Sequence, residues 1–333
     1  MSITALRSEI DQLKELCERH SHVMILGHKD ADGDTLGCSL AFAEALRERG
    51  KRVSVVIPHP LPQKYAWMPG FDQIVETPDS AETIDLVLFF DAGNMERSGS
   101  AAAHVAEHAT IVNVDHHSSN SRFGDVNIID AEASAVGQMC LDMLEHFEWR
   151  ISPSMATNLY TALITDTGGF RHENTTPRAL RDAARLAALG ADPSYVASMV
   201  YKSRPLTAVR LSGLSIVSMQ VEMDGRLVWT KVTRRMLREA GAVMADSEDI
   251  IDTLNSLADI DLAIIFKEVG PRLTKISARS RGPVDASALC AQFGGGGHRR
   301  AAGAELPLRL DQAIPTVLEA AREVIDAAGS ARG

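Results

Sequence analysis

The sequence predicts an α/β protein in which a doubly wound, mainly parallel sheet is followed by a smaller α+β domain. In the first half, short apolar runs with little polar alternation are separated by helical patterns, as in parallel strands buried on both faces. Beyond residue 215, the pattern changes to strands paired through tight turns. The length of 333 residues exceeds what one hydrophobic core usually organises, so two domains are expected.

Four apolar runs are the expected parallel strands of the first domain: HVMILG (22–27), VSVVI (53–57), IDLVLFF (84–90) and TIVNV (110–114). An amphipathic helix is expected near the N-terminus, and further helices are expected at 36–49, about 100–108, 133–148, 153–165 and 178–189. This alternation is typical of doubly wound sheets, whose ligand sites lie beyond the carboxyl ends of the strands.

The second domain is predicted from turn signals. Asp224-Gly225 separates strand-like segments at 215–223 and 227–232, and Gly270-Pro271 separates segments at 261–269 and 272–279. A short helix near 285–292, the loop GGGGH (294–298) and a helix over 310–327 complete the pattern. We therefore expect a catalytic domain at 1–190, a helical linker at 191–214 and a substrate-binding domain at 215–330.

Composition and charge exclude several classes of protein. The net charge of −10 does not suggest a protein that coats nucleic acid. The four cysteines form no CxxC pair, which argues against a zinc ribbon or a disulfide framework. No apolar run approaches the roughly 20 residues that span a bilayer, so a cytoplasmic protein without membrane attachment is expected. Residues 267–303 carry seven Lys and Arg against two acids, which indicates either a grip on an anionic substrate or a solvated basic face.

Potential metal ligands gather where the predicted strands end. The first loop, HKDADGDTLG (28–37), is one such place, and the full set of candidates is His28, Asp32, Asp34, Asp91, Asp115, His116, His117 and Asp166. Carboxylates mixed with imidazoles suit Mn²⁺, Mg²⁺ or a similar divalent ion better than a structural zinc. The ligands are too many for one ion, which favours a two-metal site with a shared carboxylate.

Each residue alone also has an ordinary structural explanation. An aspartate after a strand is more often a helix cap or a turn residue, and a His-His pair is more often structural. The repetition of this context at several strand ends favours the metal site. Two ions of this kind lower the pKa of a water and stabilise an in-line displacement at phosphorus, so phosphoester or phosphoanhydride hydrolysis is predicted.

The ordered motifs resemble those of the DHH phosphoesterase superfamily. The similarity lies in HKDADGDTLG, Asp91, the DHH of 115–117, Asp166 and the late GGGGHRRAAG, which resembles the motif of the DHH-associated C-terminal domain. The chain length resembles the nanoRNase and pAp phosphatase branch of this superfamily. The sequence departs from the usual pattern at Ala31, where the family typically has proline, and at Cys38, which is often serine. Neither position is a metal ligand.

The resemblance implies a role for each candidate. His28 and Asp32 would hold one divalent ion, Asp34, His116 and Asp166 the other, and Asp91 would bridge both. His117 would contact the phosphate or assist the leaving group, and Asp115 would orient a neighbouring histidine. Two divalent ions are expected, Mn²⁺ first, with Mg²⁺ or Co²⁺ as alternatives.

Substrate recognition is expected from the glycine-rich loop. Consecutive glycines let backbone N–H groups approach an oxyanion, although glycines alone would indicate a flexible turn. With the family's motif, Gly295, Gly296, Gly297, His298 and Arg300 are expected to bind the substrate phosphate or the terminal nucleotide. Arg279 resembles the family's substrate-binding arginine, and a bidentate phosphate contact is plausible there. Arg171 is a further candidate for substrate binding, although without the resemblance a surface arginine after a turn is an equally good interpretation.

The expected activity is hydrolysis of short oligoribonucleotides, such as nanoRNA and pApA-like dinucleotides, and of the nucleoside bisphosphate pAp, through a water activated by two metal ions. The alternatives are a cyclic-dinucleotide phosphodiesterase, an inorganic pyrophosphatase or exopolyphosphatase, and a non-catalytic nucleotide sensor. The late motif disfavours the pyrophosphatase, and the complete ligand set disfavours the sensor. The sequence does not determine which substrate is preferred, from which end an RNA would be degraded, or whether the protein forms a homodimer.

Overall fold

The computed structural model describes residues 6–78 and 84–330. The chain divides into two compact units, Met1–Ser203 and Arg204–Gly333. This division falls inside the segment 191–214 that the sequence predicts as a linker. Helix α6 (Pro193–Tyr201) belongs to the first unit, and helix α7 (Leu206–Val217) belongs to the second. The segment 191–214 therefore contributes one helix to each unit, and the predicted domain bounds stay a prediction.

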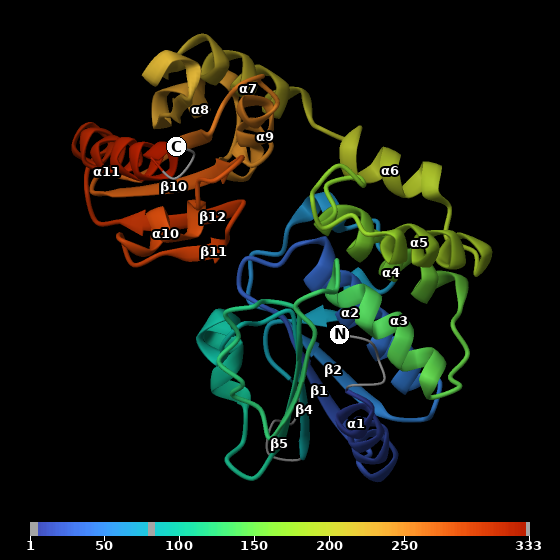
Figure 1. Cartoon of the computed structure of the whole chain (residues 1–333). Coiled ribbons are helices and arrows are strands. Elements are labelled where there is room, and N and C mark those ends of the chain that lie inside the picture. The colour runs from blue at the N-terminus through green and yellow to red at the C-terminus, as the bar shows by residue number, and fades with distance from the viewer. Residues whose placement is uncertain (1–5, 79–83, 331–333) are drawn as a thin grey trace. The chain divides into compact units, whose positions relative to one another are not determined.

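The first unit is built on a six-stranded parallel sheet of order β3-β2-β1-β4-β5-β6 (Figure 1). Its strands are β1 (His22–Leu26), β2 (Arg52–Val56), β3 (Ile74–Val75), β4 (Leu86–Phe90), β5 (Thr110–Asp115) and β6 (Val126–Ile129). The strand order reverses between β1 and β4, which are hydrogen-bonded neighbours. In open parallel sheets, ligands bind beyond the strand ends at such a reversal.

The central strands are apolar on both faces and are fully buried. In β1, Val23 and Ile25 join the main core, whereas Met24 and Leu26 join a smaller core on the other face. The main core includes residues of α1 (Arg7–Arg19), α2 (Gly33–Arg47), α3 (Val136–His146), α4 (Pro153–Asp166) and α5 (Pro177–Ala188). The smaller core includes Ala101 of the 3₁₀ helix η5 (Met95–His104). Two short 3₁₀ helices, η2 (Gln63–Tyr65) and η3 (Phe71–Gln73), precede β3.

Three helices of the first unit begin with the same local signal, a capping side chain followed by proline. Ser152, Thr176 and Asp192 accept backbone hydrogen bonds at the starts of α4, α5 and α6, and each is followed by a proline. The cap satisfies an amide that has no partner inside the helix, and proline has no N–H to lose at this position. This signal fixes the start of α4, whose last residue is Asp166.

The second unit contains a six-stranded sheet of order β11-β12-β10-β9-β8-β7, in which β8 and β9 are parallel and the other pairs are antiparallel. Its strands are β7 (Gln220–Glu222), β8 (Leu227–Val232), β9 (Leu262–Gly270), β10 (Leu273–Ser280), β11 (Gly296–His298) and β12 (Ala301–Leu306). Its other helices are α8 (Arg234–Ala240), α9 (Ile250–Asn255), α10 (Ala286–Ala291), α11 (Leu310–Ser330) and the 3₁₀ helices η6 (Met223–Gly225) and η7 (Met244–Ser247). The predicted fold class is confirmed.

Three predicted elements differ from the structure. The helix expected at about 100–108 is the 3₁₀ helix η5, which ends at His104. The expected strand 215–223 is wrong in its first part, because α7 continues to Val217 and only Gln220–Glu222 are extended. The helix is stabilised over these residues by its packing against β8, because Leu211 is buried in a core with β8 and Ser215 Oγ donates to Lys231 O. The expected loop GGGGH ends as the short strand β11. No helix in the described part of the chain is long and apolar enough to cross a membrane.

Candidate active site

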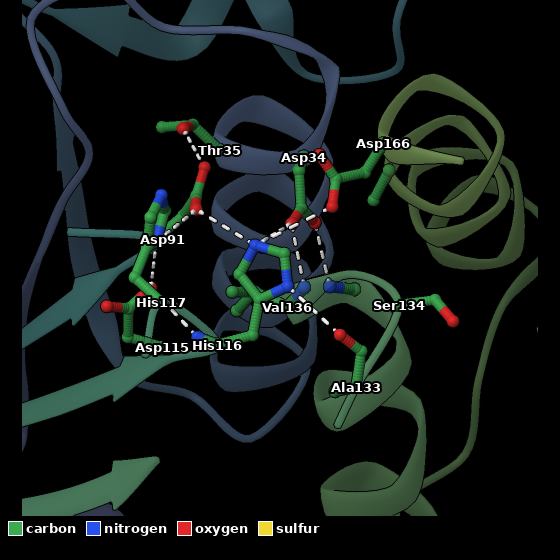
Figure 2. Close-up of polar contacts among 12 residues, drawn as sticks. Asp34, Thr35, Asp91, Asp115, His116, His117, Ala133, Ser134, Val136 and Asp166 are labelled. Carbon is green, nitrogen blue, oxygen red and sulfur yellow. Dashed lines mark hydrogen bonds and ion pairs between the residues drawn. The ribbon is translucent and has the colours of Figure 1, made fainter. Parts of the chain in front are cut away.

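The ligand candidates of the first unit converge at the carboxyl ends of β1, β4 and β5. His28 follows β1, Asp91 follows β4, and the DHH motif begins with Asp115, the last residue of β5. Figure 2 shows Asp91 and the two adjacent histidines of this motif directed toward one another, with Asp34 and Asp166 approaching from helices. The structure therefore brings together residues that lie far apart in the sequence.

Asp91 lies at the centre of this cluster. One carboxylate oxygen, Oδ2, lies 3.3 Å from His28 Nε2 and accepts a 2.6 Å hydrogen bond from Thr35 Oγ1. The other, Oδ1, lies 3.8 Å from His116 Nε2 and 3.7 Å from His117 Nδ1. The residue has a left-handed backbone with φ of +57°, which costs about 1–3 kcal/mol outside glycine. This conformation turns the side chain away from the strand direction and into the cluster.

Asp32 and Asp34 are both tied to helix starts. Asp32 Oδ1 accepts hydrogen bonds from the amides of Asp34 and Thr35, so it is the N-cap of α2. The two carboxylate oxygens of Asp34 accept from Val136 N and Gly137 N at the start of α3, at 2.7 and 2.8 Å. The positive ends of two helices thus stabilise negative charge here. The Asp32 side chain is 52% exposed, in contrast to Asp34, which is buried.

His116 is oriented by the backbone of the loop before α3. Its Nδ1 lies 3.1 Å from the carbonyl oxygen of Ala133, and this contact favours a proton on Nδ1. Its Nε2 faces carboxylates, at 3.6 Å from Asp166 Oδ2 and 4.0 Å from Asp34 Oδ2. A neutral imidazole held in this tautomer presents the Nε2 lone pair to a cation, as metal-binding histidines do.

His117 is held by Asp115, the buried residue before the histidine pair. His117 Nδ1 lies 2.7 Å from Asp115 Oδ1, and the same oxygen accepts the backbone N–H of His116 at 2.8 Å. Burial disfavours a charged His117, but the Asp115 hydrogen bond and the charge of Asp91 outweigh it and raise the pKa of the imidazole. This geometry agrees with the predicted orienting contact of Asp115.

The cluster concentrates negative charge in a buried place. Burial, together with the charges of Asp91 and Asp166, raises the pKa of Asp34 well above its usual range. Burial also raises the pKa of Asp166 to about 7, against the opposing effect of His116. For His116 itself, burial opposes the charged form, but three carboxylates around it outweigh burial and raise its pKa to about 10. These shifts mark a site that gains from a bound cation.

The donor atoms fit divalent ions. Three groups of ligand atoms, each within 4.8 Å of one another, include Asp91: His28 with Asp32, Asp34 with His116, and Asp115 with His117. All of these donors are carboxylate oxygens and imidazole nitrogens, which suit Mn²⁺-like or Mg²⁺-like ions. Asp91 is common to all three groups, and its role as a carboxylate that bridges two ions stays a prediction. Asp166 joins the second group through His116.

Arg171 follows the end of α4 in a turn of unusual backbone. Gly168, Gly169 and Phe170 all have left-handed φ values, and Arg171 Nε donates to Gly168 O at 2.6 Å. Its guanidinium carbon lies 5.7 Å from the centre of the Tyr201 ring. Arg171 is thus an exposed arginine with a defined position, and a role in substrate binding stays a prediction.

In the second unit, strand register places the predicted substrate residues on one face. Arg279 of β10 pairs with Ala301 of β12, and Ala301 pairs with His298 of β11. Directly paired residues of antiparallel strands point to the same face, so the arginine and the histidine lie on either side of a small residue. Two strand spacings separate them by roughly 10 Å at the backbone. Arg279 Nε also lies 3.5 Å from Asp252 Oδ1.

The neighbouring row across these strands holds only small residues: Ser277, Gly303 and Gly296. Within the motif, Gly294 and Gly297 have φ of +74° and +140°, which favour glycine. At Gly295, a Cβ atom would lie 2.2 Å from Gly303 O, so packing requires glycine there. At Gly296, a Cβ atom would meet nothing within 4 Å. The fold therefore does not itself require a glycine at Gly296.

The two arginines after His298 are held at the loop that follows β10. Arg299 donates to Pro283 O, and Arg300 Nη1 donates to Gly282 O at 2.6 Å. Both contacts attach the motif to the end of β10, close in sequence to Arg279.

Sequence reasoning missed several residues that support the cluster. Thr35 holds Asp91, Ala133 orients His116, and Asn113 and Asn120 contact the loop after Asp91. Thr35 and Asn120 lie within a few residues of predicted ligands, and this proximity is the only feature of the sequence that indicates a supporting role for them. Asn113 lies inside an apolar strand, where a buried polar residue itself signals a hydrogen-bond network.

Comparison with known proteins identifies both units. The DHH family N-terminal domain matches residues 22–164, and the DHHA1 domain matches residues 226–327. The bifunctional oligoribonuclease and PAP phosphatase NrnA of Thermus thermophilus is 33% identical over 313 residues, which cover 92% of this chain and 91% of that protein. The protein of the same name from Bacillus subtilis is 25% identical and covers 85% and 89%, respectively.

Solved structures share the fold at lower sequence identity. An exopolyphosphatase-related protein from Bacteroides fragilis has a TM-score of 0.90 at 24% identity, covering 97% of this chain and 98% of that one. RecJ from Thermus thermophilus, solved with Mn²⁺, has a TM-score of 0.58 at 15% identity and covers 98% and 55%. The two domain matches and the similarity to a full-length relative agree with the buried DHH cluster. The chain therefore belongs to the DHH family, in the NrnA-like branch that carries a DHHA1 domain.

Proposed function

We propose that this protein hydrolyses short oligoribonucleotides, pApA-like dinucleotides and nanoRNA among them, and also pAp. The observation that carries the proposal is the pair of ligand groups that share Asp91 in a buried, acidic setting. The relative from Thermus thermophilus, named as an oligoribonuclease and PAP phosphatase, supports the substrate class. In this proposal, residues 1–190 form the catalytic domain and residues 215–330 recognise the nucleotide.

Two divalent ions, Mn²⁺ first among them, are assigned to the two ligand groups. His28 and Asp32 belong to one, and Asp34, His116 and Asp166 belong to the other, with Asp91 common to both. When bound, such ions supply a nucleophilic water near neutral pH and stabilise charge at phosphorus. The oxygen and nitrogen donors, the helix starts behind Asp32 and Asp34, and the raised carboxyl pKa values support this assignment.

His117 is assigned to the substrate. The contact of Nδ1 with Asp115 fixes the ring in position, and Nε2 is assigned to a phosphoryl or leaving-group oxygen of the substrate. Asp115 acts through His117 by orienting it, as carboxylates do behind catalytic histidines.

The second unit is assigned to phosphate and nucleotide binding. Arg279 and His298 share one face across three strands and provide donors for a phosphate group. The open space at Gly296 leaves room for a ligand close to the backbone, and Gly295 and Gly297 are assigned to the same binding loop. Arg300 adds charge next to this face, and Arg171 is assigned to substrate from the first unit.

A substrate panel tests the proposal. Initial rates are measured with Mn²⁺ on pAp, pApA, cyclic di-AMP, RNAs of two to ten nucleotides and pyrophosphate, and then repeated with Mg²⁺ and Co²⁺. We expect pApA, the shortest RNAs and pAp to be hydrolysed, with rates that fall as the RNA lengthens. A preference for cyclic di-AMP or pyrophosphate would reassign the substrate, and pApA binding without turnover would indicate a sensor.

A further inference from the structure

Behind the DHH motif lies a pair of asparagine side chains that the proposed chemistry does not use. Asn113 is fully buried in β5, and Asn120 lies half-buried in the loop after the motif. Asn120 Nδ2 donates to Asn113 Oδ1 at 2.8 Å. Buried amides of this kind are costly unless they are hydrogen-bonded, so their partners indicate what the pair is for.

The first partner is the backbone immediately after Asp91. Both side-chain amides donate to the carbonyl oxygen of Ala92, from Asn113 at 3.1 Å and from Asn120 at 3.2 Å. The next peptide is held as well, because Ser121 N donates to Gly93 O at 2.9 Å. These bonds hold the two peptides after Ala92, in the turn that leaves the left-handed backbone of Asp91. The asparagine pair therefore holds the turn next to the residue that both ligand groups share.

The second partner is the carboxylate that orients His117. Asn120 Nδ2 donates to Asp115 Oδ2 at 2.6 Å, while Asp115 Oδ1 faces His117 Nδ1 and His116 N. Asp115 is fully buried, so loss of a donor to Oδ2 would leave an ionised oxygen poorly satisfied. A rotation that corrected this deficit would pull Oδ1 away from His117.

We propose that Asn120 is a positioning residue that aligns Asp91 and the Asp115–His117 pair through a single side-chain amide. It acts through these groups and does not contact substrate. The role deepens the proposed function and rests on it for the kinetic measurements alone. An ordinary explanation also exists: Asn120 Oδ1 accepts from Arg122 N, and Asn120 N donates to His117 O, as in a loop whose side chain only stabilises a turn.

The variant Asn120→Asp separates the two explanations. A carboxylate retains an acceptor for Arg122 N, so the turn contact is preserved, but it donates no hydrogen bond to Ala92, Asn113 or Asp115. Asn120→Ala removes both functions and is a second test if the aspartate impairs folding. Asn127→Ala is the matched control, because Asn127 is also half-buried and bonds the backbone of Gly124 with both side-chain groups.

Three measurements are made on each variant: the melting temperature, kcat and KM for pApA with Mn²⁺, and the imidazole ¹⁵N–¹H spectrum of the metal-free protein. The His117 signals are assigned with His117→Gln. For both Asn120 variants, we expect kcat to fall roughly 10–100-fold with KM little changed, as for other residues behind an active-site histidine. The Nδ1 proton signal of His117 should shift or broaden. Asn127→Ala should keep the wild-type kcat and spectrum.

Two results would overturn the inference: wild-type kcat in Asn120→Asp, or an unchanged His117 signal in both Asn120 variants. A loss of kcat that follows the melting temperature and also occurs in Asn127→Ala would reduce Asn120 to a turn residue. If the wild-type protein does not hydrolyse pApA, the proposed function fails, but the spectrum still tests the positioning role.

Discussion

The candidate metal ligands of the first unit are mostly buried, whereas the candidate substrate residues of the second unit lie on one face of a sheet. Asp34, Asp91 and His116 are at most 8% exposed, and their charges interact strongly enough to shift their pKa values. In the second unit, His298 is exposed and Arg279 is half-exposed beside small residues. A buried cluster of carboxylates and imidazoles suits small cations that are held at fixed positions. An open face that carries positive side chains suits a larger, anionic ligand.

Under the proposed function, this difference would separate catalysis in the first unit from substrate recognition in the second. The buried cluster is defined by strand ends, helix starts and hydrogen bonds, so its geometry is set before any ligand arrives. The open face is defined by register and by the absence of side-chain bulk. Substitutions in the two units should therefore change different quantities: catalytic rate and metal affinity in the first, and substrate affinity in the second.

The largest effect is expected from Asp91→Ala, which removes the carboxylate common to both ligand groups. Hydrolysis of pApA should fall by at least roughly 1,000-fold, beyond the 10–100-fold typical of residues that only support ligands. The fold should persist, because the backbone bonds around this position, from Asp91 N to Val114 O and from Asn113 Nδ2 to Ala92 O, do not involve the side chain of Asp91. Activity and Mn²⁺ binding by calorimetry are measured, with Asp311→Asn, an exposed carboxylate on α11, as the control. Retained activity after metal reconstitution would contradict the bridging role.

The next effect concerns Arg279→Ala in the second unit. Loss of one charged hydrogen bond to phosphate should lower kcat/KM by roughly 10–100-fold, mainly through KM. The affinity for Mn²⁺ should remain unchanged in Arg279→Ala, whereas it should fall in Asp91→Ala, and this contrast distinguishes the two units. Arg272→Ala is the matched control, because Arg272 is an exposed arginine at the other end of β10. An equal loss in both variants would point to general electrostatic attraction.

A smaller effect is expected from Gly296→Ala. The fold has space for a methyl group there, so the melting temperature should be unchanged. A ligand that approaches the backbone would meet the methyl group, and KM should rise about tenfold. Gly295→Ala provides the contrast, because its Cβ would clash with Gly303 O and should lower stability. An unchanged KM in a stable Gly296→Ala protein would place the ligand away from this glycine.

The smallest effect tests whether buried charge outside the cluster also reduces stability in the first unit. Asp142 of α3 pairs with Arg178, yet burial raises the pKa of its carboxyl to about 6. Because this value exceeds the value of 3.8 in the unfolded chain, stability is higher when Asp142 is protonated and falls as the pH rises through 6. Between pH 5 and 8, Asp142→Asn should gain about 1 kcal/mol relative to wild type.

Chemical denaturation of the metal-free protein at both pH values measures this change. Asp311→Asn again serves as the control for the altered net charge. If the stability difference between Asp142→Asn and wild type is the same at pH 5 and pH 8, the carboxyl of Asp142 does not titrate in this range.

The sequence allowed the ligand cluster to be predicted because parallel strands deliver their carboxyl ends to one edge. His28, Asp91 and His116 could be placed together from strand positions alone. The contacts of Asn113 and Asn120 could not, since they depend on how two loops fold against each other. β-branched residues near 216–221 favoured a strand, but the packing of α7 against β8 prevailed. The strand β12 escaped prediction because alanine and glycine have weak strand preference.

The contacts of Asp34 limit how this candidate metal centre could be transferred to another protein scaffold. Its carboxylate is a candidate ligand and, at the same time, the acceptor for two amides at the start of α3. Those amides lie about a hundred residues away in sequence, and each donates a hydrogen bond to a different carboxylate oxygen of Asp34. The loop 28–37 copied alone would therefore carry an aspartate with two missing hydrogen-bond donors. The smallest portable centre includes the turn and first residues of α3.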